Sequence, residues 1–173
     1  MIRIETETRI RAPIELCFDM ARDIGLHTRT VWPFTREKAA AGVTEGKIGA
    51  GELVTFEATH FGIRQKLTSR ITGYDRPFIF VDEMVTGAFK SMRHEHRFEE
   101  ITACETVMRD TLLFEAPLGV AGLLAERLVL KAYMSKFLHY RNRELKKNRR
   151  VRGKIIDITD SDRELLRKGN GPA

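Results

Sequence analysis

The segment 89–114 constrains the fold of this chain more than any other stretch, because it predicts two long β-strands joined by a turn near 99–103. Residues two apart in a strand share one face. That rule groups apolar and ionisable side chains together: Met92, His94, His96 and Phe98 on the first strand, and Thr106, Met108, Asp110, Leu112 and Phe114 on the second. A core face would be apolar throughout, and a solvent face would lack Met and Phe. The mixture is typical of a cavity wall that holds a mostly apolar small molecule with a polar handle.

Shorter elements precede this pair of strands. The segment 2–11 alternates Ile and Thr with charged residues, which predicts a first strand. Pro13 is suited to the start of a helix over 14–23, which Gly25 would end, and 26–37 predicts a second short helix and a turn. Regularly spaced glycines then separate four β-rich runs, at 38–43, 52–61, 63–74 and 78–85, which predict antiparallel hairpins. With the first strand and the two strands of 89–114, the sequence predicts about seven strands.

A long C-terminal helix is predicted over 118–147, the longest stretch without a helix breaker. One face of this helix is mostly apolar, and Arg141 lies on it one turn from both Leu138 and Leu145. Such a helix can cover the concave face of a curved antiparallel sheet, which gives an α+β fold. We expect one domain over 1–148, followed by a basic tail over 149–173.

Alternation along the strands and the helix periodicity predict the residues around the cavity. The apolar wall should contain Phe56, Phe80, Met84, Met92, Phe98, Met108, Leu112 and Phe114, with Trp32, Leu124, Met134 and Leu138 near the mouth or on the helix side. Trp32 would serve either as a plug at one end of the core or as a lid. The polar groups at or behind the cavity should be Asp82, His94, His96, Asp110 and Arg141.

A buried arginine needs a carboxylate partner, and we expect Asp110 to be that partner, with Asp82 as the second choice. This pair has two interpretations, a structural link between helix and sheet or a ligand contact. For the two histidines, recognition of a ligand hydroxyl, carbonyl or carboxylate is the favoured interpretation.

Catalysis is the main alternative to binding. His94, His96 or Asp110 could act as a general acid or base on a carbonyl substrate, with a carboxylate orienting the imidazole. No nucleophile with a supporting base, phosphate loop, G-x-S-x-G or dinucleotide motif is present in the sequence. Two histidines on one side of a strand could also hold a metal with His60, Asp82 or Asp110, but no dense His/Cys cluster exists. We therefore expect binding without a metal or cofactor.

Charge and composition limit the partners. The net charge is +6, and most of the excess lies between 141 and 154. A basic helix end of this kind is usually a solvated face, so no nucleic-acid partner is expected. Weak contact with an anionic membrane or an acidic protein through the tail is an open alternative. The sequence leaves both a monomer and a homodimer open. The charged N-terminus lacks the apolar region of a signal peptide, which predicts a cytoplasmic protein with Cys17 and Cys104 as reduced packing residues.

The order of elements and several short strings resemble the START-like, or SRPBCC, superfamily, and within it bacterial proteins of the polyketide cyclase/dehydrase-like type. The likeness covers 1–147 and rests on these strings: F-V-D at 80–82, G-A-F at 87–89, H-E-H-R-F at 94–98, T-V-M-R-D at 106–110, P-L-G at 117–119 and F-L-H-Y-R at 137–141. The resemblance implies a helix-grip fold with these strings around the pocket. It also implies binding, transport or sensing of a small hydrophobic molecule, with a cyclase or dehydratase acting on a polyketide-like or aromatic substrate as the alternative, since the superfamily contains lipid carriers, hormone receptors and aromatic cyclases.

Overall fold

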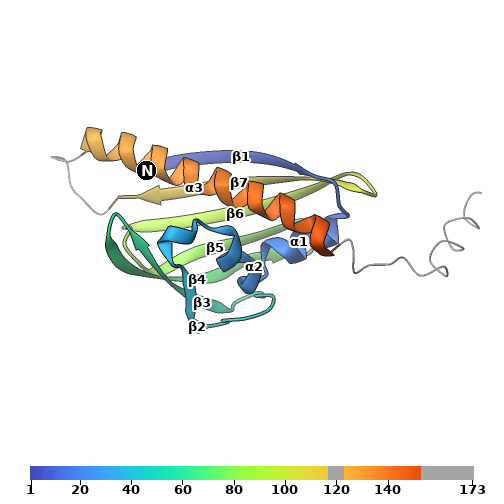
Figure 1. Cartoon of the computed structure of the whole chain (residues 1–173), viewed down its shortest axis with the longest axis horizontal. Helices are drawn as coiled ribbons and strands as arrows, with labels where there is room; N and C mark the ends of the chain where they lie inside the picture. Colours follow the sequence, from blue (N-terminus) through green and yellow to red (C-terminus); the bar gives the residue numbers. More distant parts are fainter. Residues whose placement is uncertain (117–122, 153–173) are drawn as a thin grey trace, which may run out of the picture.

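The β-strands form one curved antiparallel sheet in which the first strand pairs with the last (Figure 1). A computed structural model of the chain describes residues 1–116 and 123–152, with side chains up to 116 and over 129–148. The strand order is β1-β7-β6-β5-β4-β3-β2. The strands are β1 Ile2–Ile10, β2 Lys38–Gly42, β3 Leu53–His60, β4 Ile63–Asp75, β5 Ile79–Thr86, β6 Ser91–Thr102 and β7 Glu105–Glu115. The predicted seven-stranded α+β architecture is confirmed.

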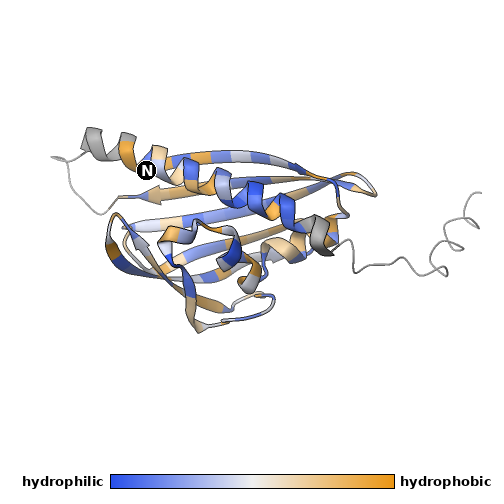
Figure 2. Cartoon of the chain, viewed as in Figure 1, coloured by the Kyte–Doolittle hydropathy of each residue, from blue (hydrophilic) through white to orange (hydrophobic). Residues whose placement is uncertain are grey.

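Alternation of side chains gives each strand one face toward the interior. Along β1, Ile2, Ile4 and Thr6 are buried, while the residues between them are exposed, and Figure 2 shows the corresponding change of hydropathy. Pairing of β1 with β7 places Ile4 opposite Leu112. A meander needs no crossover, so each hairpin forms from residues close in sequence and only β1 has to join the far edge.

Two short helices follow β1, as the sequence predicts: α1 Ile14–Ala21 and α2 Ile24–Thr30. The predicted helix end at Gly25 is wrong, because Gly25 lies in the first turn of α2. Asp23 caps that turn by accepting a hydrogen bond from the Leu26 amide at 2.8 Å. A carboxylate cap of this kind satisfies an amide that has no partner within the helix, so it starts a new helix where glycine alone suggests a stop. A 3-10 turn, η1 Pro33–Thr35, then leads to β2.

The C-terminal helix, α3 Leu123–Arg152, runs across the sheet and contacts β1 and α2 (Figure 1). The residues predicted to begin this helix, 118–122, lie outside the described residues, as do most of the predicted tail and the short helix expected over 160–168. In the part of the chain that is described, no helix combines the length and apolar character that a bilayer span needs.

Two apolar clusters stabilise the sheet and its helices. The larger one surrounds Phe18 of α1, which is fully buried and makes edge-to-face contacts with Tyr74, Phe80 and Phe98. The smaller one joins the other end of the sheet to α3 and contains Ile2, Ile4, Met92, Leu112, Phe114 and Leu138. Both clusters lie on the face of the sheet that carries the helices, so the site must be found between or beside them.

Neither cysteine forms a disulfide. Cys17 is buried in the larger cluster, in agreement with its predicted packing role. Cys104 is exposed in the tight turn between β6 and β7, so the packing role predicted for it is wrong. The turn is tighter than the predicted 99–103 because both strands continue almost to Cys104.

Phe18→Ala should lower the free energy of unfolding by about 3–5 kcal/mol, because it removes a ring at the centre of three aromatic contacts and leaves a cavity. Urea denaturation followed by circular dichroism measures this loss. Phe78→Ala is the matched control, because Phe78 is 54% exposed, and it should change stability by less than about 0.5 kcal/mol. Equal effects of the two substitutions would contradict the position of Phe18 at the centre of the core.

Candidate functional site

A cavity of about 690 Å³ lies between the sheet, α1, α2 and α3. Apolar side chains form most of its wall. Successive inward residues of β3 line one side: Val54, Phe56, Ala58 and His60. The opposite side is a stripe along α3, formed by Val129, Leu130, Tyr133, Met134, Phe137, Leu138 and Arg141. These helical residues share one face because they are separated by one, three or four positions.

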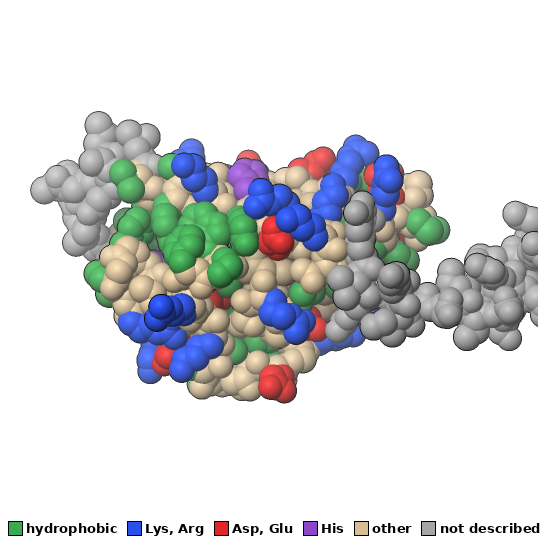
Figure 3. Space-filling model, in the orientation of Figure 1, with side chains coloured by type: hydrophobic (Ala, Val, Ile, Leu, Met, Phe, Trp, Pro, Cys, Tyr) green, Lys and Arg blue, Asp and Glu red, His purple; other side chains and the backbone are tan. Residues whose placement is uncertain are grey.

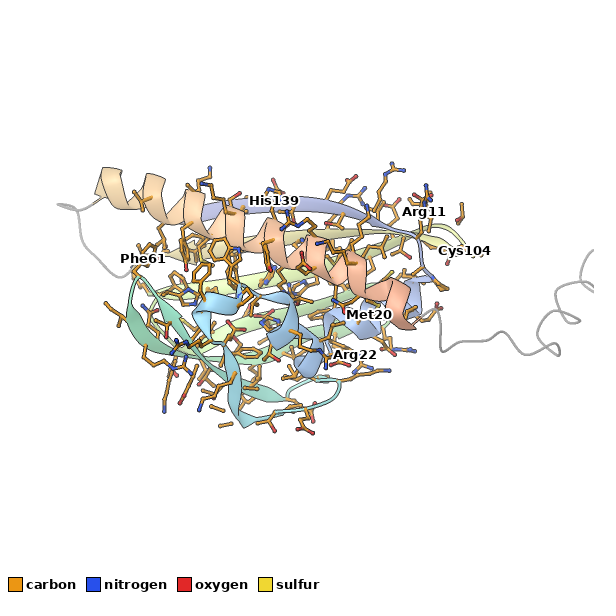
Figure 4. All side chains as sticks on the ribbon, in the orientation of Figure 1. Arg11, Met20, Arg22, Phe61, Cys104 and His139 are labelled. Carbon is orange, nitrogen blue, oxygen red and sulfur yellow. The ribbon has the colours of Figure 1, made fainter. Side chains whose placement is uncertain are left out.

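The cavity extends from the β3–β4 hairpin toward α1. Figure 4 places Phe61 at that hairpin and Arg22 beside the end of α1, and both residues line the cavity. Around the hairpin end, large apolar lining residues reach solvent: Phe61 is 59% exposed, Ile63 63% and Val129 59%. We take this end as the mouth, because an apolar molecule can enter there over apolar side chains.

A group of aromatic side chains lies outside the wall near the middle of α3. Trp32 stacks on Phe34 and makes edge contacts with Tyr133 and Phe137, which themselves line the cavity. Figure 3 shows apolar side chains gathered over this part of the molecule, with lysines and arginines around them. Trp32 is therefore one layer removed from the cavity lining and supports two of its wall residues from behind.

The register of three strands brings four ionisable residues together on the inward face of the sheet. Asp82 of β5 lies opposite His94 of β6, and His96 lies opposite Asp110 of β7. His94 and His96 are two apart on the same strand, and their ring centroids lie 3.9 Å apart. The four side chains therefore form a compact polar cluster beside the apolar wall.

His96 is held between two carboxylates. Its Nδ1 lies 2.5 Å from Asp110 Oδ1 and its Nε2 lies 3.3 Å from Asp82 Oδ1. Burial alone would lower the pKa of His96, but the charge of Asp110 and the hydrogen bonds to both carboxylates outweigh it and raise this pKa above the ordinary 6.5. An imidazolium that donates from both nitrogens fits this geometry.

His94 has the opposite electrostatic environment. Burial lowers its pKa below 6.5, and the charge on His96 lowers it further. Within the part of the chain that the structure describes, its Nε2 is buried without a hydrogen-bond partner, because the nearest carboxylate oxygen, Asp110 Oδ1, is 3.6 Å away. His94 is thus favoured as a neutral imidazole in the cavity wall.

Asp110 lies behind the wall and joins four elements. Besides the imidazole of β6, it accepts hydrogen bonds from Thr6 of β1 at 3.2 Å and from Asn142 of α3 at 2.5 Å. Burial would raise the pKa of Asp110, but the charge of His96 and its hydrogen bond hold this pKa well below 3.8. The carboxylate is therefore ionised and serves as a shared acceptor.

The predicted Asp110–Arg141 pair is wrong. The helix residue that reaches Asp110 is Asn142, whereas Arg141 is turned by about one third of a helical turn toward the cavity. Arg141 is 4% exposed, and its one hydrogen bond to a described residue runs from Nη2 to the Ala21 carbonyl at 3.4 Å. Its Nε has no partner among the described residues.

Many of the predicted lining residues occupy the cavity wall: Phe56, Phe80, Asp82, Met92, His94, His96, Leu112, Met134, Leu138 and Arg141. Whether they contact a ligand stays a prediction. Leu124 lies where the structure describes no side chains.

The remaining predicted wall residues lie elsewhere, for physical reasons that alternation alone does not reveal. Phe98 and Met108 face inward but are covered by α1 in the larger cluster. Phe114 packs on Phe89, and Met84 packs against the smaller cluster. Alternation gives the face of a strand, whereas the helix that covers it decides which part becomes core.

Sequence reasoning missed two polar pairs in the wall. His60 Nδ1 lies 2.8 Å from the Tyr133 hydroxyl, and His27 Nε2 lies 2.9 Å from Glu37 Oε1. The alternation Val54–Phe56–Ala58–His60 could have identified His60. No local signal pairs His27 with Glu37, because they come from separate loop and helix segments.

A metal could be held only with a change of protonation at the polar cluster. Asp82, His94 and His96 each offer one potential ligand atom, and these three atoms lie within 4.8 Å of one another. Among the described residues, this is the one group of three or more potential metal ligands. Their donor types, two imidazoles and a carboxylate, suit Zn²⁺ or Fe²⁺. Asp82 already accepts from His96 Nε2, so a metal would have to displace that proton. The expected absence of a metal stays a prediction.

Solved structures share this fold at low sequence identity. A protein from Thermus thermophilus has a TM-score of 0.67 at 17% identity over 84% of this chain and 95% of its own. A START superfamily protein from Mycobacterium smegmatis has a TM-score of 0.65 at 12% identity, covering 84% and 95%. The ZhuI aromatase/cyclase from Streptomyces sp. R1128 has a TM-score of 0.67 at 18% identity, covering 85% and 92%. No protein-family model and no curated protein matches the sequence. The chain therefore has a START-like, helix-grip fold.

The two histidines should differ sharply in their effect on stability. His96→Leu leaves Asp110 and Asp82 without their shared cation and should cost about 3–5 kcal/mol near neutral pH. The matched variant His94→Leu removes a nitrogen that has no partner and should cost less than about 1 kcal/mol. Urea denaturation at pH 6 measures both.

The cost of His96→Leu should also depend on pH. Because folding raises the pKa of His96, its contribution is complete below 6.5 and declines as pH rises through the folded-state pKa. Denaturation at a series of pH values up to 9 measures the decline. A cost that grows with pH would contradict the charged state assigned to His96.

Proposed function

We propose that this START-like protein binds a small, mostly apolar molecule in the cavity between its sheet and α3, as a carrier or a sensor. The observation that supports this most directly is the cavity of about 690 Å³ with an apolar wall. Small-molecule sites typically have about 300–1,000 Å³, mostly apolar walls and a few convergent polar groups. The ionisable residues at its inner part supply such groups.

The route into the cavity supports binding as well. Exposed apolar residues at the mouth, Phe61, Ile63 and Val129, continue into the buried apolar wall. Moving an apolar ligand from water into this wall releases about 25 cal/mol for each Å² covered. A ligand of modest size can therefore bind from its apolar area alone, and the polar cluster can act on its orientation.

The neutral apolar probe N-phenyl-1-naphthylamine should bind the protein and become fluorescent, since its rings fit an apolar cavity. Ala58→Phe should weaken this binding by about tenfold or more, because Ala58 is a buried lining residue and the larger ring occupies ligand space. Fluorescence titration measures the affinity.

Ala40→Phe is the matched control for this experiment. Ala40 is exposed on β2 and does not line the cavity, so this variant should bind like wild type. Circular dichroism of both variants confirms that they are folded. Unchanged probe affinity in folded Ala58→Phe would show that the probe binds elsewhere and would end the proposal.

Catalysis on a carbonyl substrate is the second candidate, and one observation favours it. His94 lines the cavity, and burial and the charge on His96 favour its neutral imidazole form, which has one basic nitrogen. Such a nitrogen can take a proton from a carbon next to a carbonyl, and the resulting enolate can close a ring by attack on a second carbonyl. The proton then returns from His94 to the new alkoxide, and loss of water follows. His96 is unsuited to this role because both of its nitrogens are engaged by carboxylates.

If the protein is a cyclase or dehydratase, a poly-β-keto substrate should yield a cyclised or dehydrated product, and His94→Ala should lower the rate by about 10²–10⁴-fold. Mass spectrometry of the products measures turnover. His139→Ala is the matched control, since His139 is an exposed histidine of α3 that does not line the cavity (Figure 4). Absence of product with wild type, or equal rates in the two variants, would remove this candidate.

A further inference from the structure

We propose that Arg141 binds the carboxylate of an amphiphilic acid, so that the natural ligand carries an acidic head at the inner end of the cavity and an apolar body toward the mouth. This inference rests on the proposed function, because it names the class of ligand for the same cavity. The unused hydrogen-bonding capacity of the guanidinium is its main support.

Arg141 has far more donors than acceptors around it. A guanidinium carries five N–H groups in one plane and stays charged in proteins. Its one hydrogen bond within the described residues is the 3.4 Å contact from Nη2 to the Ala21 carbonyl, and Nε is buried without a partner. Burial of a charged group without hydrogen bonds is unfavourable, so an acceptor supplied by a ligand would be bound strongly.

The other basic residues of the cavity wall already have partners. Arg22 bonds to Asp19 at 2.8 Å and to the Ile48 carbonyl at 3.0 Å. Lys66 is largely exposed and pairs with Glu57 at 3.1 Å. Among the described arginines and lysines that line the cavity, Arg141 is thus the buried one that forms no ion pair.

The position of Arg141 on α3 fixes the orientation of the ligand. Apolar lining residues extend along the helix from Val129 to Leu138, and Arg141 is the next lining residue after them. The twelve positions from Val129 to Arg141 correspond to about 18 Å of helix. An acid with an extended apolar chain or several fused rings matches this length, with its head at Arg141 and its tail at the exposed mouth.

The neighbouring charges allow this assignment and also supply the rival explanation. Asp82 and Asp110 are already bonded to His96, so neither needs Arg141 as a direct partner. Arg141 still acts on Asp82 through space. In the rival explanation Arg141 only balances the charge of this acidic pair, and no ligand carboxylate is involved.

Competition binding separates the two explanations. Dodecanoate and dodecan-1-ol have the same chain and differ in their head. Each can displace N-phenyl-1-naphthylamine from wild type, Arg141→Met and Lys136→Met at pH 8. Wild type should prefer dodecanoate by about tenfold or more, since a buried charge-assisted pair is among the stronger polar contacts. Arg141→Met should lose this preference while its affinity for the alcohol and the probe changes by less than about threefold. Lys136→Met should keep the preference, because Lys136 is an exposed lysine of α3 that does not line the cavity.

The other outcomes of the competition experiment contradict either the role of Arg141 alone or the proposed function as well. Probe binding without acid preference in wild type, or an equal preference in Arg141→Met, overturns the role of Arg141 and leaves the proposed function standing. Failure of all three compounds to bind wild type overturns both. If Arg141→Met does not fold, the test uses wild type instead: the ¹³C chemical shift of [1-¹³C]dodecanoate bound to the protein is followed as a function of pH. The bound carboxyl should stay ionised below the pKa of the free acid, and titration at or above that pKa overturns the assignment.

Discussion

The hydrogen bonds around Asp110 hold together the parts of this fold that are farthest apart in sequence. Thr6 from the first strand, His96 from β6 and Asn142 from α3 all donate to one buried carboxylate. The carboxylate also lies on the strand that pairs with β1, so the attachment of β1 to the sheet and the position of the helix depend on the same group. Loss of any partner would leave the buried charge incompletely hydrogen-bonded and would destabilise the fold, so the relative placement of these three elements is well defined.

This arrangement also explains why the cavity exists beside a well-packed core. Asn142 and Leu145 fix α3 against the sheet near α1, where the larger apolar cluster fills the space. Toward its N-terminal part, α3 presents Tyr133 and Phe137 to the cavity, the gap between helix and sheet that the 2.8 Å contact of Tyr133 with His60 bridges at the end of β3. Aromatic support from Trp32 behind these rings keeps the wall in place without filling the gap.

Much of the fold could be predicted from the sequence, because periodicity, Pro13 and the turn glycines identify strands and helices locally. Pairing His94 and His96 with Asp82 and Asp110 could also be anticipated, since alternation places all four on inward faces. The exact partner of Asp110 could not. Arg141 and Asn142 are adjacent, and the rotation of the helix about its axis, set by packing on β1, decides which of them reaches the sheet. Likewise, alternation assigns Phe98 and Met108 to the correct face, but only the position of α1 shows that they belong to the core.

The exposed apolar rim formed by Phe61, Ile63 and Val129 has a consequence for the rate of exchange. A deeply buried apolar molecule that had to cross a ring of hydrated charges would lose its contacts before gaining any others, and its departure would be slow. If the cavity binds an apolar molecule as proposed, its contacts along this rim would be lost gradually as it leaves, and this would lower the barrier to its departure. Exposed apolar residues of this kind can also contact another apolar surface, as direct transfer of a bound molecule to a second apolar acceptor would require.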